Sequence, residues 1–169
     1  LSERRSALAI VRTQDRLLEP VMELKEAVWG IHPRNREQHF ALDACLRRDI
    51  DVVCLVGKAG TGKTLMALAA GLQQVADQSI YAKLLVSRPI MPMGRDIGFL
   101  PGDIEDKLKP WMMPIHDNVE FLMGEGFDGR SSRRDRGVSE LTNQGLLEIE
   151  PLTYIRGRSI PNQFMIIDE

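Results

Sequence analysis

Apolar residues in the first part of the chain recur at helical spacing. Between Leu17 and Val28 they return every three to four residues with charged residues between them, which predicts a helix over residues 1–28. Pro20 falls inside this pattern, so we expect the helix to kink or to break into two pieces. A turn is predicted at 29–33, where the sequence WGIHP combines a glycine with a proline.

Two further patterns flank a glycine-rich segment. A second helix is predicted over residues 35–47. Residues 52–56, VVCLV, are continuously apolar and rich in β-branched side chains, which is typical of a central parallel strand covered on both faces. After the glycines, a helix is predicted from Lys63 to about Ala76.

The second half of the chain continues this alternation. A strand is predicted at 83–87, KLLVS, followed by a loop rich in proline and glycine over 88–103. The remaining predicted elements are a helix at 104–109 capped by Asp103, a helix from Trp111 to about Met123 that Pro110 separates from it, an exposed loop at 124–137, a helix at 138–144, a strand near 146–150, a turn at Pro151 and a strand at 164–168. Alternating strands and helices predict an α/β fold with a parallel sheet.

Composition and charge are those of a soluble globular protein. The chain has 169 residues, of which 43% are hydrophobic and 27% charged, and one domain is expected at this length. A net charge of -2 argues against a polybasic nucleic-acid tail, although not against a local basic groove. No stretch reaches the roughly 18 uncharged residues of a membrane helix. Cys45 and Cys54 are too few for a four-cysteine zinc site, so we expect reduced thiols and a cytoplasmic protein.

The segment between the second helix and the third matches the phosphate-binding pattern G-x-x-x-x-G-K-[ST]. Its glycines let the backbone wrap a phosphate with the N–H groups pointing inward, and the helix that follows adds its N-terminal dipole. In this pattern Lys63 reaches the β- and γ-phosphates and the Thr64 hydroxyl binds Mg²⁺. The predicted nucleotide-binding residues of this loop are Gly57, Lys58, Ala59, Gly60, Thr61, Gly62, Lys63 and Thr64.

A second motif stands at the end of the chain. The apolar run FMII leads into Asp168 and Glu169, as in a Walker B strand. Asp168 is expected to hold Mg²⁺ through water, and Glu169 to orient and polarise the water that attacks the γ-phosphate. Taken alone, the pattern also fits a surface acid at the end of any strand.

A third candidate precedes the phosphate loop. Asn35 and Gln38 on the second predicted helix resemble the adenine-reading glutamine of helicase-type ATPases. A glutamine amide offers one donor and one acceptor in a plane, which suits N6 and N7 of adenine. The alternative is an ordinary polar helix face. The adenine reading predicts ATP in preference to GTP.

With these motifs the chain resembles the PhoH-like family of P-loop ATPases. The residues that carry the resemblance are RNREQ at 34–38, LVGKAGTGKTLMALAAGL at 55–72, SRPIMPMGRDIGFLPGDIEDKLKPW at 87–111, YIRGRSI at 154–160 and FMIIDE at 164–169. The resemblance implies a parallel sheet of RecA and helicase type, with an extra strand between the two nucleotide-binding strands. It also implies ring-shaped homo-oligomers. WGIHPRN at 29–35 resembles the members in which a PIN ribonuclease domain precedes the ATPase, and for these the resemblance implies ATP-dependent unwinding and degradation of RNA.

The same resemblance divides the chain. Residues 28–169 correspond to the N-terminal part of the ATPase domain, and residues 1–27 to a linker or the edge of an upstream domain. The sequence starts with Leu1 and stops at Glu169 straight after an apolar run, so we interpret it as a C-terminally truncated piece. We expect that piece to be poorly stable and inactive alone, because the extra strand of this sheet order would come from later residues.

Two other function classes remain open at this point. A P-loop kinase that phosphorylates a small molecule shares the phosphate loop, but seldom pairs Asp168 with a water-polarising Glu169. A GTP-binding switch would carry D-x-x-G after its switch strand, and that pattern is absent from these 169 residues.

For several side chains the sequence favours neither a functional nor a purely structural interpretation. Arg88, Arg95, Arg156 and Arg158 could contact RNA or a neighbouring subunit, or could form ordinary salt bridges. Trp111 and the two methionines after it are expected in the core rather than on a base-stacking surface.

Overall fold

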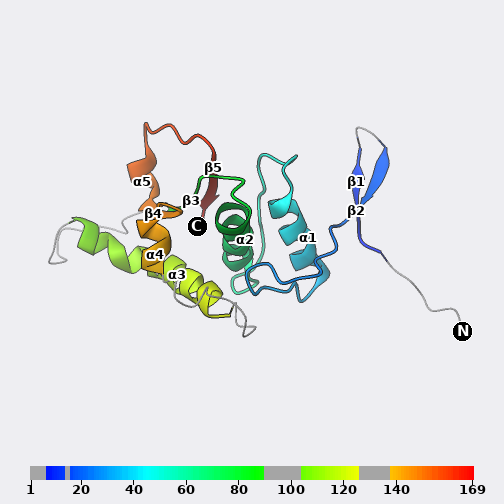
Figure 1. Ribbon diagram of the computed structural model, residues 1–169, viewed down its shortest axis with the longest axis horizontal. Coiled ribbons are helices and arrows are strands. Elements are labelled where there is room, and N and C mark those ends of the chain that lie inside the picture. Colours follow the sequence, from blue (N-terminus) through cyan, green and yellow to red (C-terminus); the bar gives the residue numbers. More distant parts are fainter. Residues whose placement is uncertain (1–6, 14–15, 90–103, 126–137) are drawn as a thin grey trace, which may run out of the picture.

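The computed structural model describes residues 7–13, 16–89, 104–125 and 138–169. Its elements are β1 (Ala9–Arg12), β2 (Leu17–Pro20), α1 (Arg36–Leu46), α2 (Lys63–Leu72), the π-helix η1 (Gln73–Asp77), β3 (Lys83–Arg88), α3 (Ile104–Glu125), α4 (Val138–Asn143), β4 (Leu147–Pro151), α5 (Leu152–Ile155) and β5 (Gln163–Ile167). Figure 1 shows β1 and β2 at one end of the molecule, α1 and α2 in the middle, and α3, α4 and α5 at the other end.

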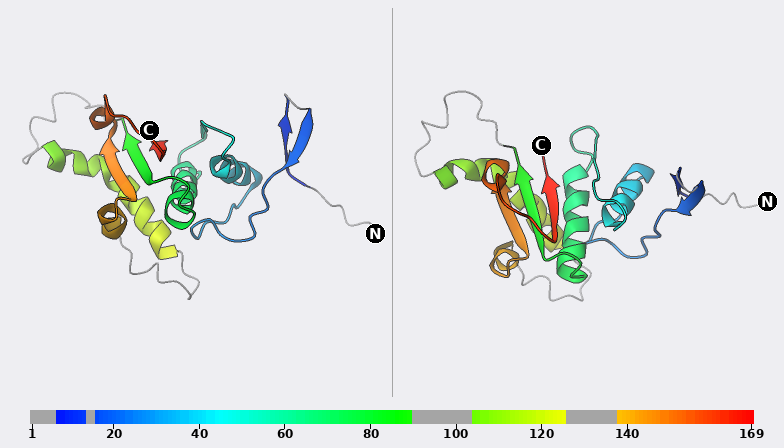
Figure 2. Two further views of the ribbon diagram at one scale, coloured as in Figure 1. Left: turned by 45° about the horizontal axis from the view of Figure 1, so that its top comes forward. Right: turned by 90° about the horizontal axis from the view of Figure 1, so that it is seen from above.

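The centre of the fold is a parallel sheet of three strands in the order β4-β3-β5. Leu84 and Val86 of β3 have no exposed surface, and they share one core with Ile166 of β5 and with buried residues of α2, α3 and α4. Figure 2 shows the three strands running in one direction, with α2 and α3 beside them. The α/β class and the parallel sheet that the sequence predicts are therefore confirmed.

Helices α1 and α2 lie side by side next to this sheet (Figure 1). Asn35 caps α1 by accepting a hydrogen bond from the Gln38 backbone N–H at 2.8 Å. The buried Gln74 amide donates to the Cys45 carbonyl at 2.9 Å, which ties the end of α1 to η1, the π-helix that continues α2. A Cβ on Gly71 would come within 2.7 Å of Leu84, so the glycine lets α2 pack closely on β3 and β5.

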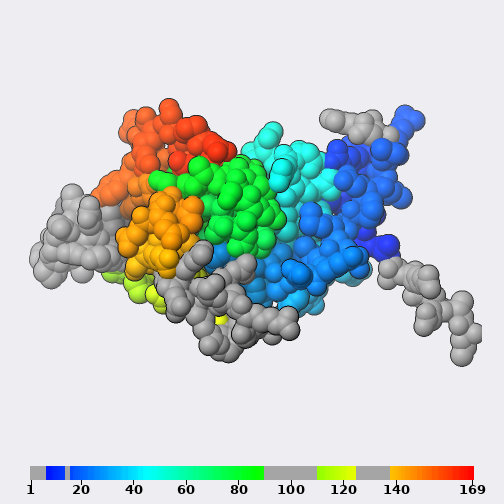
Figure 3. Space-filling model, in the orientation of Figure 1, coloured from blue at the N-terminus to red at the C-terminus, as the bar shows by residue number. Residues whose placement is uncertain are grey.

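The prediction of a helix over residues 1–28 is wrong for the described part of that range. β1 and β2 form an antiparallel hairpin in which Val11 pairs with Leu18. The spacing that imitated a helix comes from a hairpin strand followed by an irregular segment. The Arg47 guanidinium donates to Glu19 at 2.7 Å, which fastens the hairpin to the end of α1. Figure 3 shows the hairpin as a protrusion at one end of the surface.

The predicted strand at 52–56 is also not formed. The segment is extended toward the phosphate loop but pairs with no strand among the described residues. Val52 is 78% exposed and Val56 is 95% exposed. The physical reason is that β5 does not reach this segment, so its backbone lacks the ladder partner that makes a strand.

The predicted break at Pro110 is wrong as well. α3 runs without interruption and contains both Pro110 and Pro114. Each proline removes one helical hydrogen bond, but buried side chains such as Ile115 and Val119 hold the helix against the core. Trp111 is 41% exposed and Met113 50% exposed, so their expected place in the core is wrong, whereas Met112 between them is buried.

Other elements follow the sequence with small shifts. The helices near 35–47 and 138–144 and the strands near 83–87, 146–150 and 164–168 are confirmed as α1, α4, β3, β4 and β5. The helix after the phosphate loop changes to a π-helix at Gln73, and a short helix, α5, follows β4. The predicted cap at Asp103 and most of both predicted loops lie outside the described residues. None of the helices in the described part of the chain is long and apolar enough to cross a membrane.

Candidate functional site

The phosphate loop occupies the turn between residue 56 and α2. Gly60 and Gly62 have φ angles of +76° and +86°, a left-handed backbone that favours glycine. A Cβ on Gly60 would meet no atom within 4 Å, so the loop leaves open space on that side. The loop braces itself through the Thr61 hydroxyl, which donates to the Lys58 carbonyl at 2.8 Å. The loop therefore adopts backbone angles that its glycines permit and that other residues rarely adopt.

Lys63 is the first residue of α2 and folds back into the loop. Its ammonium donates to the carbonyls of Gly57 at 2.8 Å and Lys58 at 3.1 Å. The amine therefore lies over the loop. A helix start and a lysine at the same point are the features that favour phosphate groups.

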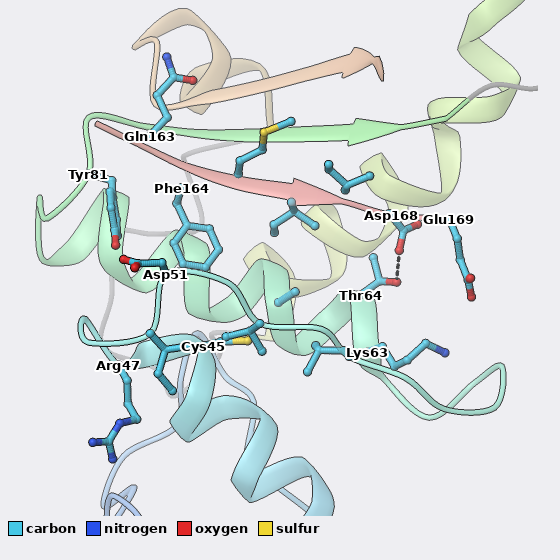
Figure 4. Close-up of a pocket in the computed structure, with 17 residues that line it drawn as sticks. Cys45, Arg47, Asp51, Lys63, Thr64, Tyr81, Gln163, Phe164, Asp168 and Glu169 are labelled. Atoms are coloured by element: carbon cyan, nitrogen blue, oxygen red, sulfur yellow. Dashed lines mark hydrogen bonds between the residues drawn. The ribbon is translucent and has the colours of Figure 1, made fainter. Parts of the chain in front are cut away.

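The acidic motif after β5 contacts the phosphate loop at the start of α2. The Thr64 hydroxyl donates to Asp168 Oδ1 at 2.6 Å, a contact between residues 104 positions apart (Figure 4). The Asp168 backbone N–H donates to the Ser87 carbonyl at 2.8 Å, so the ladder between β5 and β3 places this carboxylate. Glu169 follows directly and is exposed. A hydroxyl and a carboxylate are hard oxygen donors of the type that Mg²⁺ prefers, so these residues fit that ion.

A cavity of about 300 Å³ extends from this site between residues 50–55 and β5. Lys63, Thr64, Asp168 and Glu169 line its polar end. Figure 4 shows these side chains at one end of the cavity and Tyr81 and Asp51 at the other. Its lining also includes the apolar side chains of Val53, Leu55, Ala67, Phe164 and Ile166. The candidate site thus lies at one end of a longer groove.

Gln38 lies against the phosphate loop with its amide already engaged. Its Oε1 accepts from the Arg34 backbone N–H at 2.8 Å, and its Nε2 donates to the Thr61 carbonyl at 3.2 Å. Together with the cap at Asn35, the first of these bonds fixes the start of α1, in a variant of the capping box in which the donor is the N–H of Arg34, one residue before the cap. The structure thus brings Gln38 to the site, although both halves of its amide bind protein.

The arginines flagged in the sequence have different surroundings. Arg158 donates to Glu150 at 2.6 Å and forms an ion pair with Glu148 at 2.9 Å. These contacts favour the interpretation of Arg158 as a salt-bridge residue. Arg88 lies within 3.5 Å of the Trp111 carbonyl, and Arg156 is exposed. Arg95 lies outside the described residues.

Sequence reasoning missed one residue of the site. Ser87 is fully buried at the carboxyl end of β3, and its hydroxyl has no hydrogen-bond partner in the described residues. Its carbonyl fixes Asp168, as described above. The signal was available, because a polar serine ends the apolar run of β3 at the sheet edge where the two motifs meet.

The arrangement can bind a polyphosphate at the loop and a hard cation between Thr64 and Asp168. It can also present a carboxylate, Glu169, beside that cation. These are the parts required for nucleotide binding and for attack of water on a terminal phosphate.

Comparisons with known proteins agree with this site. The family model described as PhoH-like protein matches residues 30–169. Protein PhoH2 of Bacillus subtilis (strain 168) is 52% identical over 164 residues, which cover 97% of this chain and 36% of that protein. Protein PhoH2 of Mycolicibacterium smegmatis is 39% identical over 143 residues, 84% of this chain and 30% of that protein.

A more distant relative gives the same result. The PhoH-like protein of Bacillus subtilis is 33% identical over 126 residues, 75% of this chain and 36% of that protein. The chain spans about a third of the length of these curated relatives. The family model covers the phosphate loop and the whole parallel sheet, so the chain belongs to the PhoH-like family, a family of P-loop nucleoside triphosphatases.

Proposed function

We propose that this protein binds ATP together with Mg²⁺ and hydrolyses it. The observation that carries the proposal is the 2.6 Å hydrogen bond between Thr64 and Asp168, since it joins the phosphate loop to the carboxyl end of β5. Magnesium supplies neutralisation of the charge on the β- and γ-phosphates when it is bound. Thr64 and Asp168 would hold it, and the backbone of Gly57 to Gly62 would cradle the phosphates.

Each catalytic side chain has a distinct task in this proposal. Lys63 exchanges its contacts with two loop carbonyls for contacts with phosphate oxygens, which gives shorter and stronger charged hydrogen bonds. Glu169 accepts a proton from the attacking water and holds that water in line with the γ-phosphate. Its exposed position at the end of the cavity supports this role.

Two substitutions separate binding from hydrolysis. Glu169→Gln keeps the side-chain shape but removes the base, so we expect ATP affinity near the parent value and hydrolysis slower by about 10²–10⁴-fold. Asp168→Asn should instead weaken the magnesium-dependent part of binding. Measurements of ATP affinity and of single-turnover hydrolysis distinguish the two. A Glu169→Gln variant that hydrolyses ATP at the parent rate would assign the base to another residue.

Gln38 is proposed to read the adenine base. It lies beside the loop, and its amide would have to release Thr61 and Arg34 to contact a base. Gln38→Ala should then reduce the preference for ATP over GTP by about 1–3 kcal/mol, the discrimination of one bidentate amide–base pair. Titrations with ATP, GTP and tripolyphosphate provide the test. An equal loss for all three ligands would show that Gln38 supports the loop and does not read the base.

We further propose that ATP hydrolysis drives unwinding or degradation of RNA, in a cytoplasmic homo-oligomeric ring. The support is the resemblance to the PhoH-like family, and the relatives' names add nothing on RNA. Hydrolysis rates with single-stranded RNA and with small phosphate acceptors test the coupling. Stimulation by a small acceptor alone would favour the kinase reading, and a preference for GTP would favour the switch. Analytical ultracentrifugation tests the ring.

The finer fold proposal is a sheet of RecA and helicase type. It is supported by the apolar groove between residues 52–56 and β5, because both segments run toward the same site and neither has a partner on the facing edge in the described residues. A parallel strand seated between them would make one continuous sheet. The stability of a Val56→Thr variant, measured by urea unfolding, tests this proposal.

A further inference from the structure

A row of charged side chains lies on the face of the sheet opposite α2, α3 and α4. Lys83 of β3 donates to Glu148 of β4 at 2.5 Å. Arg158, in the segment after α5, pairs with the same Glu148 at 2.9 Å and with Glu150 at 2.6 Å. We call Lys83, Glu148 and Arg158 the charged clasp.

The register of the strands explains why these groups meet. Glu148 lies opposite Leu85 and Glu150 opposite Ser87, so both carboxylates alternate with Leu147 and Ile149 along β4. Leu147 faces the helical core. The carboxylates therefore project from the other face, as does Lys83, which stands two residues before Leu85.

The clasp joins all three parts of the chain that place β5. Lys83 belongs to β3, the strand on which β5 pairs, and Glu148 belongs to β4 on its other side. Arg158 belongs to the exposed connection that leads from α5 into β5. Along that connection the next fixed point is Asn162, whose carbonyl accepts from the Ala82 N–H at 2.9 Å.

The position of β5 decides where Asp168 lies. In the described residues β5 pairs only with β3, so one edge of it has no ladder support. Its last bond is the one from Asp168 N–H to the Ser87 carbonyl, and its side chain must stay within reach of Thr64. A shift of β5 along β3 would move the carboxylate away from that hydroxyl.

We propose that the charged clasp holds β5 in register and that Glu148 and Arg158 are thereby positioning residues for the magnesium ligand Asp168. The proposal rests on the proposed function, because it takes Asp168 as a ligand. The proposal goes beyond that function because it predicts that a residue of β4, a strand that does not pair with β5, affects how tightly Mg²⁺ is held.

Glu148 and Glu150 are not equivalent in this role. Glu148 pairs with two cations and Glu150 with one. The hydrogen bond with Glu150 and the two cations lower the pKa of Glu148 to about 2, whereas the neighbouring Glu148 carboxylate raises the pKa of Glu150. Glu148 therefore lies at the centre of this network, and Glu150, on the same strand face, is a more peripheral member that contacts only Arg158 among the cations.

The test measures how much Mg²⁺ is needed for nucleotide binding. A fluorescent ATP analogue is titrated with Mg²⁺ in the parent and in Glu148→Gln, Arg158→Gln, Arg158→Lys and Glu150→Gln, with thermal unfolding as a check of the fold. We expect Glu148→Gln and Arg158→Gln to raise the half-saturating Mg²⁺ concentration by about threefold to tenfold, within the range of couplings in such networks. Affinity for the analogue without Mg²⁺ should not change.

The controls sharpen the result. Glu150→Gln should raise the Mg²⁺ requirement less than Glu148→Gln does, because Glu150 pairs with one cation and Glu148 with two. Arg158→Lys should recover part of the loss, because a lysine can reach one carboxylate but not both. The double variant of Glu148 and Arg158 should lose no more than the larger single loss. If Glu148→Gln does not fold, Arg158→Gln carries the test, since that residue lies on an exposed connection.

Two results would overturn the proposal. Folded Glu148→Gln or Arg158→Gln proteins with the parent's Mg²⁺ requirement, while Asp168→Asn loses it, would refute the clasp and leave the proposed function standing. A parent protein whose nucleotide binding ignores Mg²⁺ would refute both.

Discussion

The strand β3 and the segment 52–56 look alike in the sequence but differ in the structure. Both are short apolar runs that lead to the nucleotide site. β3 pairs with a strand on each side, and Leu84, Leu85 and Val86 have no exposed surface. Residues 52–56 pair with nothing in the described part of the chain, and Val56 is 95% exposed. An apolar run therefore predicts a strand only where a partner is available for its backbone.

The difference also shapes the site. The loop half, residues 57–64, follows the unpaired segment, and the acidic half, Asp168 and Glu169, follows the paired sheet. α2 packs under β5 and begins at Lys63, so it joins the two halves. The hydrogen bond from Thr64 to Asp168 connects the loop half of the site directly to the acidic half.

The largest expected effect comes from truncating the paired region. Leu85→Ala should destabilise the protein by about 2–5 kcal/mol, because it leaves a cavity at a fully buried position. Val56→Thr, which keeps the side-chain shape at a 95% exposed position, should change stability by less than about 0.5 kcal/mol. Urea unfolding of the two variants and the parent measures both values.

The same two variants can also contradict the difference between β3 and residues 52–56. If Val56→Thr costs as much as Leu85→Ala, residues 52–56 are buried in the protein and an added strand covers them. That outcome would favour the sheet of RecA and helicase type, and it would mean that the groove is filled.

The sequence predicts most of the sheet and the site but not the N-terminal part. Glycines with required backbone angles, Gly60 and Gly62, make the phosphate loop recognisable from local chemistry alone. The hairpin was missed because its strands have four residues each, too few to show an alternating pattern against the helical spacing that starts at Leu17. The role of Gln38 in reading the base stays a prediction. Its contact with the Thr61 carbonyl, 23 positions away, is a tertiary detail that spacing does not encode.

A smaller expected effect concerns the stability of the fold at acidic pH. A pKa of Glu148 lowered to about 2 means that its carboxylate stabilises the fold above the ordinary value of 4.5, and that this contribution is lost as the pH falls from about 4.5 toward 2. The raised pKa of Glu150 has the opposite sign, so its contribution is lost as the pH rises through that pKa.

Thermal unfolding as a function of pH checks these signs. Glu148→Gln should flatten the acid side of the stability profile, whereas Glu150→Gln should leave neutral stability unchanged or raised. Since residues 52–56 carry no carboxylate, this acid sensitivity belongs to the paired region. Identical profiles for the two variants would contradict the asymmetry.

The central claim is that residues 57–64 bind the phosphates of ATP, and calorimetric titration of ATP at fixed Mg²⁺ tests it most directly. Lys63 supplies a charged hydrogen-bond donor over the loop, so Lys63→Ala should weaken ATP affinity by about tenfold to a hundredfold. Lys25→Ala, at an exposed position near the hairpin, is the control for lost charge and should bind like the parent. An unchanged ATP affinity in a folded Lys63→Ala protein would contradict the account.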